Sequence, residues 1–424
     1  MTAVADITQE EALARLAAIV GPADTQLAGD AIRVAPGSTG QISEVLRFAN
    51  ERGLSVVPTG GGTKVGWGNP VAPEIFLSLA RMNAVREHAW QDLTCTVEAG
   101  CTWAAMQAAL ADHGQTVALD PLWPDHATVG GVVATNDSGA LRLRYGGLRD
   151  LIIGMTIVLA DGTIAKTGGK VVKNVAGYDL HKLMTGSFGT LGVITEVNFR
   201  LHPVEQHARS FTFTAPFAAE FAAPLRNLLH AQLALSSAQL RADNDGCALD
   251  VRICTRPECV DDQTTRLRAI FGHLAMAESN PAVWLAREQL FASPDAALVK
   301  ASMLPTQICE LAADFMRSAA AVDVSLVAQA TGLATIAFSQ PHVTDAAMAS
   351  LVARARTVPS AVDRLRFALR RTGGSAVVLD LPQSLRSEID CWDCHSDALP
   401  LMREIKRRFD PNLVLGPGRF VGGI

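Results

Sequence analysis

The sequence predicts an α+β protein with two domains. Its 424 residues are enough for two or three domains and a large core. Two helix-start patterns occur early, Thr8 with Glu11 and Ser38 with Gln41, in which a Ser or Thr three residues before a Glu or Gln caps the helix. Glycine-rich segments with strand character follow. Beyond residue 203 the glycine content falls and strand and helix patterns alternate, so we place a domain boundary near residue 205.

The first half of the chain is expected to begin with helices and to continue mainly with strands. Apolar residues at helical spacing follow both capping patterns, while short runs rich in Val and Ile are typical of strands. Asp161-Gly162, between two such runs, is a strong hairpin signal. The helices are expected over residues 8–19, 38–52 and 102–113, and the strands over residues 32–34, 54–57, 75–79, 94–98, 152–159, from 164 onward, and 191–201.

The second half alternates strands with helices, which is the pattern of an α+β domain whose sheet is covered on one face. Strands are expected over residues 209–214, 249–254, 333–338 and 376–381. Helices are expected over residues 217–231, 259–271, 307–320 and 345–356. A last helix, residues 397–409, is expected to end at Asp410-Pro411.

Composition argues against several classes of protein. A net charge of −5 argues against a nucleic-acid partner. No apolar run reaches the roughly 18 residues of a membrane-spanning helix, and the first six residues lack the basic and apolar segments of a secretory signal. We therefore expect a cytoplasmic protein without a transmembrane segment. Apolar residues make up 49% of the chain, which favours extra buried surface such as a subunit interface.

The eight cysteines show no disulfide framework, and a cytoplasmic chain is expected to keep most of them as free thiols. Cys391, Cys394 and His395 form the CxxCH pattern of c-type haem attachment. Haem attachment of that kind requires export, for which the sequence gives no signal, so we interpret the pattern as coincidental. A redox or metal role for these three residues stays an alternative, and no metal site is predicted.

The most informative stretch is a glycine-rich loop directly after the expected strand at residues 54–57. Three consecutive glycines are costly in backbone entropy, and their use is to let several backbone N–H groups converge on a closely approaching group. An anion, above all a phosphate, is the usual ligand of such a nest. A sharp turn is the alternative, but it needs only one or two glycines. The loop consists of Pro58, Thr59, Gly60, Gly61, Gly62, Thr63 and Lys64.

Three further glycine-rich elements follow in the same half of the chain, at residues 127–139, 144–147 and 186–195. Each alone is weak evidence, because glycine-rich loops are more often tight turns. Together with the first loop, they indicate one long ligand threaded through the domain. Neither the pattern GxxxxGK[ST] nor a GxGxxG opening a βαβ unit is present, which disfavours P-loop and Rossmann nucleotide sites.

The order and spacing of these motifs resemble the FAD-binding domain of the vanillyl-alcohol oxidase/p-cresol methylhydroxylase (PCMH) family, over about residues 30–205. Gly177-Tyr178-Asp179-Leu180 belongs to the match, and residues 406–420 resemble the family's C-terminal segment. The resemblance implies a PCMH-type FAD-binding domain of two α/β subdomains, then an α+β cap domain with an antiparallel sheet and covering helices. The implied bounds are residues 1–205, 206–390 and 391–424, the last segment returning to the FAD-binding domain.

The resemblance also implies roles for individual residues. The backbone N–H groups of residues 59–63 would hold the FAD pyrophosphate, and backbone atoms of Gly192 and Ile194 would contact the adenine end. Relatives with covalent flavin carry a His or Cys near the first loop; residues 63–67 contain neither, so FAD is expected to be non-covalent. Thr128, Gly130, Gly131 and Ser138 would line the diphosphate and ribityl path. The other implied cofactor-binding residues are Pro58, Lys64, Val129, Ala134, Thr135, Asn136, Gly139, Tyr145 and Gly146.

Within that family the chain most resembles the smaller FAD-binding subunits of bacterial glycolate oxidases, also called glycolate dehydrogenases. Larger, catalytic relatives carry a His-x-Gly-Asp-Gly-Asn motif in the second domain, and here the nearest run, residues 243–246, lacks the histidine. The family's last motif often reads Asn-Pro-Gly, where this chain has Gly416-Pro417-Gly418. Both departures fit an electron-handling flavin subunit. No catalytic residue is assigned, and the dispersed histidines, of which His126 is the best candidate, are expected to be structural or exposed.

The implied function is a part in the oxidation of glycolate, a 2-hydroxy acid, to glyoxylate. The implied partners are a larger FAD-containing catalytic subunit and an iron–sulfur subunit, with peripheral contact to the inner membrane through that complex. One alternative is a self-sufficient FAD-dependent dehydrogenase for another hydroxy acid or alcohol, with an anion clamp from Arg241, Arg252 or Arg287. The other alternative is a non-catalytic scaffold subunit with a vestigial flavin site.

Overall fold

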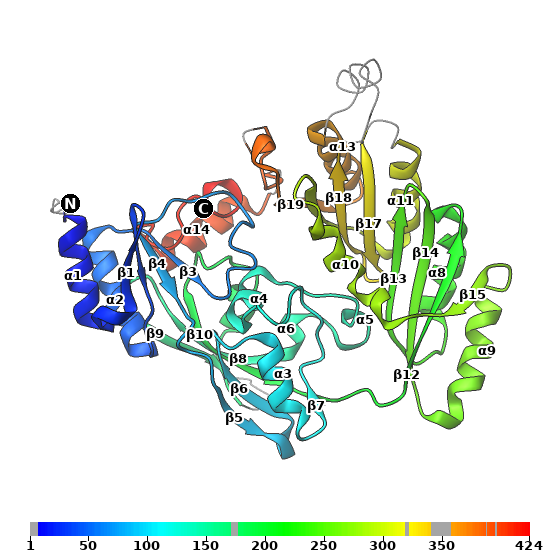
Figure 1. Ribbon diagram of the computed structural model, residues 1–424, viewed down its shortest axis with the longest axis horizontal. Coiled ribbons are helices and arrows are strands. Elements are labelled where there is room, and N and C mark those ends of the chain that lie inside the picture. Colours follow the sequence, from blue (N-terminus) through cyan, green and yellow to red (C-terminus); the bar gives the residue numbers. More distant parts are fainter. Residues whose placement is uncertain (1–6, 171–176, 319–321, 341–357, 387, 395–396) are drawn as a thin grey trace. The chain divides into compact units, whose positions relative to one another are not determined.

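The computed structural model describes residues 7–170, 177–318, 322–340, 358–386, 388–394 and 397–424 (Figure 1). They form two compact units. Unit 1 comprises Met1–Ser138, Gly146–Val204 and Cys394–Ile424, and unit 2 comprises Gly139–Tyr145 and Glu205–Asp393. Residues 139–145 therefore cluster with unit 2, whereas the sequence analysis placed them in the first domain. The expected helix at residues 345–356 lies outside the described residues.

The first sheet of unit 1 has four strands in the order β1-β2-β4-β3, of which β2, β4 and β3 run parallel. Helix α1 begins after Thr8 because the expected capping box forms: the Thr8 N–H donates to the Glu11 carboxylate at 3.0 Å, and the Glu11 N–H donates to Thr8 Oγ1 at 3.3 Å. The elements are α1 (Gln9–Val20), β1 (Thr25–Ala28), β2 (Ala31–Val34), α2 (Thr39–Arg52), β3 (Val56–Thr59) and β4 (Ile75–Ser78).

Helix α2 forms only half of its expected capping box. The Gln41 N–H donates to Ser38 Oγ at 3.2 Å, but the Gln41 side-chain oxygen accepts from the Gly37 N–H at 2.7 Å, not from Ser38. The Gln41 amide nitrogen also donates to the carbonyl of Ile19 in α1 at 3.1 Å. The side chain therefore joins the two helices instead of closing the box.

The second sheet of unit 1 is antiparallel, with five strands in the order β5-β6-β10-β8-β9. The Asp161-Gly162 turn joins β8 to β9, as the sequence predicts, and Gly162 takes the positive φ of +85° that such a turn needs. The strands are β5 (Val85–Ala89), β6 (Thr94–Glu98), β8 (Ile152–Val158), β9 (Ile164–Gly168) and β10 (Val193–Arg200), and the small pair β7 (Gln115–Thr116) and β11 (His202–Pro203) lies apart. The helices are α3 (Trp103–Ala111), α4 (Val129–Thr135), α6 (Leu148–Leu151) and α7 (Leu180–Met184).

The C-terminal segment packs into unit 1 through helix α14 (Leu399–Phe409) and the chain after it. Lys406 Nζ forms a buried ion pair with Asp410 Oδ2 at 2.6 Å and donates to the Leu415 and Thr190 carbonyls, each at 2.8 Å. The backbone of Val56 in β3 then bonds with Val414 and Gly416 on either side of Leu415. The segment thus continues the edge of the first sheet beside β3.

Unit 2 contains an antiparallel sheet of eight described strands in the order β15-β12-β14-β13-β17-β18-β16-β19. Alternate residues of each central strand form one apolar core with the helices, for example Phe213, Leu249 and Leu240 on three neighbouring strands. The strands are β12 (Ala208–Ala215), β13 (Leu235–Asp243), β14 (Gly246–Cys254), β15 (Ala275–Glu278), β16 (Ala297–Ser302), β17 (Asp323–Gln329), β18 (Leu333–Ser339) and β19 (Ser375–Asp380).

The longer helices of unit 2 line the core face of this sheet, and Figure 1 shows α8, α11 and α13 beside the strands. The helices are α5 (Arg142–Tyr145), α8 (Ala222–His230), α9 (Val260–Ile270), α10 (Ala286–Gln289), α11 (Ile308–Ser318) and α13 (Val358–Arg370). Strands β13, β16 and β17 and helix α13 are absent from the sequence prediction. No described helix of either unit is both long and apolar enough to span a membrane.

Candidate functional site

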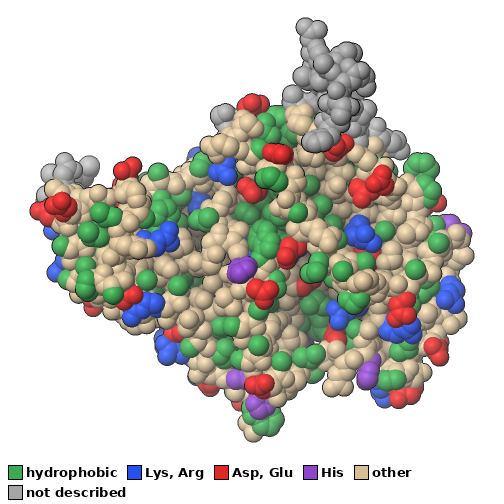
Figure 2. All heavy atoms as spheres, viewed as in Figure 1, with side chains coloured by type: hydrophobic (Ala, Val, Ile, Leu, Met, Phe, Trp, Pro, Cys, Tyr) green, Lys and Arg blue, Asp and Glu red, His purple; other side chains and the backbone are tan. Residues whose placement is uncertain are grey.

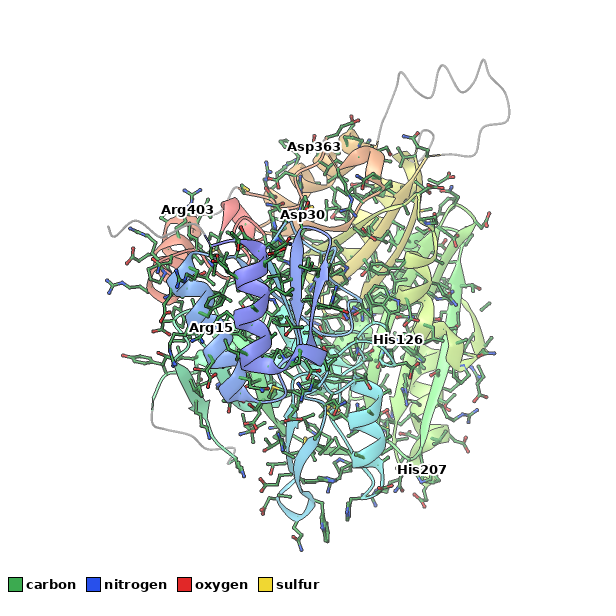
Figure 3. The ribbon with its side chains drawn as sticks, turned by 60° about the vertical axis from the view of Figure 1, so that its left-hand side comes forward. Arg15, Asp30, His126, His207, Asp363 and Arg403 are labelled. Atoms are coloured by element: carbon green, nitrogen blue, oxygen red, sulfur yellow. The ribbon has the colours of Figure 1, made fainter. Side chains whose placement is uncertain are left out.

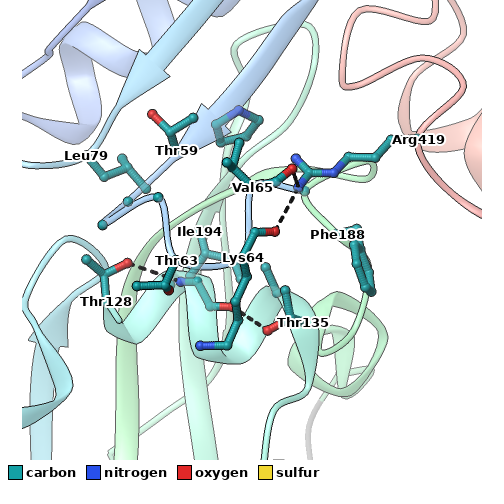
Figure 4. Close-up of a pocket in the computed structure, with 18 of the residues that line it drawn as sticks. Thr59, Thr63, Lys64, Val65, Leu79, Thr128, Thr135, Phe188, Ile194 and Arg419 are labelled. Carbon is teal, nitrogen blue, oxygen red and sulfur yellow. Dashed lines mark hydrogen bonds between the residues drawn. The ribbon is translucent and has the colours of Figure 1, made fainter. Parts of the chain in front are cut away.

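A pocket lies in unit 1, where the glycine-rich loop meets the start of α4 and the strand β10 (Figure 4). The loop after β3 supplies one wall, α4 the second, and the chain before and within β10 the third. The lining residues are Pro58, Thr59, Gly60, Gly61, Gly62, Thr63, Lys64, Val65, Leu79, Thr128, Gly130, Gly131, Ala134, Thr135, Phe188, Gly189, Gly192, Ile194 and Arg419.

The glycine-rich loop presents a run of unused backbone donors. Among the described residues, no hydrogen bond uses the N–H of Gly60, Gly61, Gly62 or Thr63. Gly61 and Gly62 are exposed and Gly60 and Thr63 are half-buried, so these four successive N–H groups at the pocket wall are accessible to a ligand with several acceptor oxygens. The donor set fits a phosphate or pyrophosphate group.

Glycine is required at two positions of the loop because the loop backbone lies very close to the residues at and before the start of α4. A Cβ on Gly60 would lie 2.0 Å from Thr128 Oγ1, and a Cβ on Gly61 would lie 1.8 Å from the carbonyl oxygen of His126. A side chain at Gly61 would require the backbone to move, and a side chain at Gly60 would require Thr128 to move. His126, labelled in Figure 3, is exposed, and the atom that matters here is its backbone oxygen.

The second glycine-rich element forms a short helix and not a loop. Thr128 caps α4, with its Oγ1 accepting from the Gly131 N–H at 3.3 Å. The first N–H groups of the helix are already used, because Val129 donates to the Cys101 carbonyl and Gly130 donates to the Ala99 carbonyl. A Cβ on Gly130 would lie 2.9 Å from Ala99 Cβ, so glycine is needed there for packing against the chain that follows β6. This helix therefore shapes the pocket wall, and the free donors come from the first loop.

Lys64 fixes the outgoing end of the glycine-rich loop. Its Nζ lies 3.3 Å from Asp137 Oδ2, in an ion pair whose two side chains are buried. The same Nζ lies 5.3 Å from the ring centroid of Trp123 and 5.6 Å from that of Trp67, and both distances are typical of cation–π contacts. Asp137 Oδ2 also accepts from the Leu122 N–H at 2.8 Å. The lysine thus holds the loop against the chain that flanks α4.

Arg419, from the C-terminal segment, closes the other side of the loop. Its Nη2 donates to the carbonyls of Val65 at 3.1 Å and Lys64 at 3.4 Å, contacts that Figure 4 draws. Burial lowers the pKa of its guanidinium from the ordinary value of 12.5. The sequence analysis did not select Arg419, although it lies in the C-terminal motif quoted for the resemblance. Phe188 was also missed, and it takes a strained positive φ of 56° at the pocket wall.

Comparison with known proteins identifies this part of unit 1. Residues 31–168 match the protein family described as "FAD binding domain", and this range includes the glycine-rich loop and α4. Residues 31–168 form an FAD-binding domain. The pocket, its unpaired amides and its two close-approach glycines are therefore features of a flavin-binding fold.

Curated relatives match about two fifths of the chain. The mitochondrial D-lactate dehydrogenase (cytochrome) of Arabidopsis thaliana is 38% identical over 177 residues, which are 41% of this chain and 31% of that protein. Glycolate oxidase subunit GlcD of Bacillus subtilis is 39% identical over 171 residues, which are 40% of this chain and 36% of that protein. The matched segment thus spans about a third of the length of each relative.

Solved structures of low sequence identity share the fold of this chain. Substrate-bound p-cresol methylhydroxylase superposes with a TM-score of 0.72 at 15% identity, covering 97% of this chain and 96% of that one. The predicted fold class is confirmed: a PCMH-type FAD-binding fold of mixed α and β structure, followed by an antiparallel sheet with helices.

Several predicted cofactor residues do not line the pocket of the FAD-binding domain. Val129 points into the apolar core because it begins a helix, and Asn136 ends that helix with φ +48°. Gly146 lies against Asp150, whose carboxylate accepts from the Gly147 N–H. The predicted residues outside the lining are Val129, Asn136, Ser138, Gly139, Tyr145 and Gly146.

Tyr145 belongs to unit 2 and has a partner there. Its hydroxyl donates to Glu205 Oε1 at 3.0 Å, and Arg252 Nη2 lies 3.2 Å from Glu205 Oε2. Burial, followed by the nearby Glu205 charge, raises the pKa of the Tyr145 phenol to about 12. This hydrogen bond joins the two chain segments that enter unit 2 from the FAD-binding domain.

The raised pKa of Tyr145 predicts alkaline destabilisation. An unfolded tyrosine ionises near pH 10, so the stabilisation is fully present below pH 10 and is lost as pH rises toward 12. We expect Tyr145→Phe to lower the free energy of unfolding at pH 8, and the gap between the proteins to shrink by pH 11. Urea unfolding at both pH values measures this gap. A gap that stays constant would contradict the assignment.

The other chemical candidates of the sequence analysis fall on structural features. The run at residues 243–246 is the turn between β13 and β14. His88 stacks edge-on against His113, which itself stacks on Trp90, and Figure 2 shows histidines gathered at the end of the molecule formed by β5. Cys391 is half-buried and Cys394 is exposed, while His395 lies outside the described residues. In the described ranges, no group of three or more His, Cys, Asp or Glu side chains is placed to hold a metal ion.

Proposed function

We propose that the chain is an FAD-dependent oxidoreductase that takes part in the oxidation of a small 2-hydroxy acid, with glycolate as the first candidate and glyoxylate as its product. The observation that carries the proposal is the row of unpaired N–H groups from Gly60 to Thr63 in an FAD-binding domain. The names of the two curated relatives, D-lactate dehydrogenase and glycolate oxidase subunit, supply the substrate class.

In this proposal the residues that line the pocket bind different parts of FAD. The N–H groups of Gly60 to Thr63 bind the pyrophosphate oxygens, and Arg419 places a positive charge beside them. Gly192 and Ile194 contact the adenine through backbone atoms. Residues 63–67 contain neither His nor Cys, which supports non-covalent binding. FAD supplies a two-electron acceptor when bound. Oxidation of glycolate releases two electrons and two protons, so the electrons need a further carrier.

The proposed complex supplies that carrier. An iron–sulfur subunit would receive the electrons, and a larger flavin subunit would carry out the oxidation of the substrate. The complex would hold the chain at the cytoplasmic face of the inner membrane. Support comes from the relative that is itself named a glycolate oxidase subunit and from the 49% apolar content, which suits a large interface.

One experiment separates the proposal from its alternatives. The full chain is purified alone, its flavin absorbance is recorded, and reduction of an electron-accepting dye is followed with glycolate and with D-lactate. Bound flavin without dye reduction supports a subunit that needs its complex, and adding the partner subunits should then restore reduction. Dye reduction by the chain alone indicates a self-sufficient dehydrogenase. A folded, colourless protein that takes up no added FAD indicates a scaffold and overturns the proposal.

A further inference from the structure

The sheet of unit 2 has a polar face opposite its apolar core. On this face, Thr212, Asp250, Gln239 and Gln329 lie side by side on four neighbouring strands, since each is the register partner of the next. Arg241 lies two residues beyond Gln239 on β13, so its side chain is on the same face. Asp250, Gln239 and Gln329 are buried, so their polar atoms need hydrogen-bond partners inside unit 2.

Asp250 is the centre of this row and is fully buried, at 0% exposure. Its Oδ1 accepts from Thr212 Oγ1 at 2.7 Å and from Arg241 Nη2 at 3.0 Å. Its Oδ2 accepts from Arg241 Nε at 2.7 Å and from Gln239 Nε2 at 3.1 Å. Each oxygen thus receives two donors, which fills the capacity of a carboxylate. Asp250 is saturated and fixes the orientation of the Arg241 guanidinium.

Arg241 is not saturated. A guanidinium has five N–H donors, and the hydrogen bonds of Arg241 engage two of them, one on Nε and one on Nη2. Among the described residues, Nη1 has no hydrogen-bond partner. The Arg241 side chain is 32% exposed, whereas Asp250 beneath it is closed off. The edge formed by Nη1 and Nη2 therefore presents donors in the geometry that a carboxylate accepts in pairs.

The chain segment after β15 covers Asp250 but does not cover Arg241. The Ser279 hydroxyl contacts Thr212, the Val283 carbonyl accepts from Gln239, and Trp284 Nε1 donates to Ser210 Oγ at 3.0 Å. This segment therefore runs over β12, β14 and the Gln239 position of β13. Arg241 lies at the margin of the covered area.

We infer that Arg241 is a binding site for the carboxylate of a small organic acid, held in position by Asp250. The choice of a 2-hydroxy acid as the natural ligand rests on the proposed function, whereas carboxylate binding itself rests on this geometry. The ion pair is neutral as a whole, so directed hydrogen bonds, more than net charge, provide the affinity. It follows that this chain binds an organic acid itself, whichever subunit carries out the oxidation.

The test uses the full chain loaded with FAD and titrated with oxalate in a calorimeter. Oxalate offers carboxylates but has no C–H bond to oxidise, so binding is measured without turnover. Arg241→Met alone would leave Asp250 buried without its cation, so the informative variant is the double change Arg241→Met/Asp250→Leu, which removes both charges. The matched control is Arg209→Met, because Arg209 makes the same two-bonded contact with Glu278 on this sheet in an exposed place.

We expect the double variant to bind oxalate about 10- to 100-fold more weakly, the effect of losing hydrogen bonds to a charged group. FAD content and the Arg209→Met control should be unchanged. Oxalate binding that survives the double change, or its absence from the unmodified chain, overturns the inference. Failure of the proposed function is a separate result: the holo-complex then reduces no dye with any 2-hydroxy acid, while oxalate binding still depends on Arg241.

Discussion

Gly61→Ala is expected to abolish flavin retention during purification. The new Cβ would lie 1.8 Å from the backbone oxygen of His126, and a backbone atom cannot turn aside as a flexible side chain can. The loop must move away, which redirects the unpaired N–H groups of Gly60 to Thr63. Losing two hydrogen bonds to a charged phosphate weakens FAD binding by about 100-fold or more.

The measurement is the FAD dissociation constant of the full chain, from flavin fluorescence, together with its melting temperature. The matched control is Gly169→Ala in the same unit, where a Cβ meets no atom within 4 Å and φ is not in the left-handed region. The control should bind FAD as the unmodified chain does. Unchanged affinity in the Gly61→Ala variant would show that this loop does not hold the cofactor.

Lys64→Met is expected to lower the free energy of unfolding by about 3–5 kcal/mol, because it leaves the Asp137 carboxylate buried without its cation. Flavin affinity should fall as well, since the outgoing end of the loop then loses its ion pair with Asp137. Urea unfolding and FAD titration of the full chain measure the two effects.

Two further variants serve as controls for the effect of Lys64→Met on stability. Lys182→Met removes an ion pair with Asp179 in which both side chains are about half exposed, so it should change the stability little. The double change Lys64→Met/Asp137→Leu removes the stranded charge, so it should recover most of the lost stability. If Lys64→Met destabilises no more than Lys182→Met, the buried pair does not hold the loop.

The sequence was sufficient for the parts of the site that depend on local backbone chemistry. Glycines that permit close approach of backbone segments can be recognised directly in the sequence. The loop from Pro58 to Lys64 and the segment around Gly130 were therefore predicted, and both line one pocket. Strand and helix periodicity also predicted most of unit 1. The same signals predicted no helix within residues 127–139, since a seven-residue helix built from Val, Gly, Ala and Thr shows no amphipathic pattern.

The residues that the sequence analysis missed act across long separations along the chain. Arg419 reaches the carbonyls of Lys64 and Val65, and no periodicity links positions so far apart. Tyr145 was assigned to the cofactor because of its glycine neighbours, but its hydrogen bond to Glu205 belongs to unit 2. Strand β13 was overlooked because the polar face that carries Gln239 and Arg241 interrupts its apolar run.

The attachment of residues 394–424 to unit 1 sets an order of events during synthesis. The ribosome makes the FAD-binding domain first, then unit 2, and only afterwards the residues from Cys394 to Ile424. Until the chain has grown past residue 419, the backbone of Val56 lacks its hydrogen bonds with Val414 and Gly416, and the pocket wall lacks Arg419. The cofactor pocket is thus completed only after the part of unit 2 that precedes residue 394 has been translated.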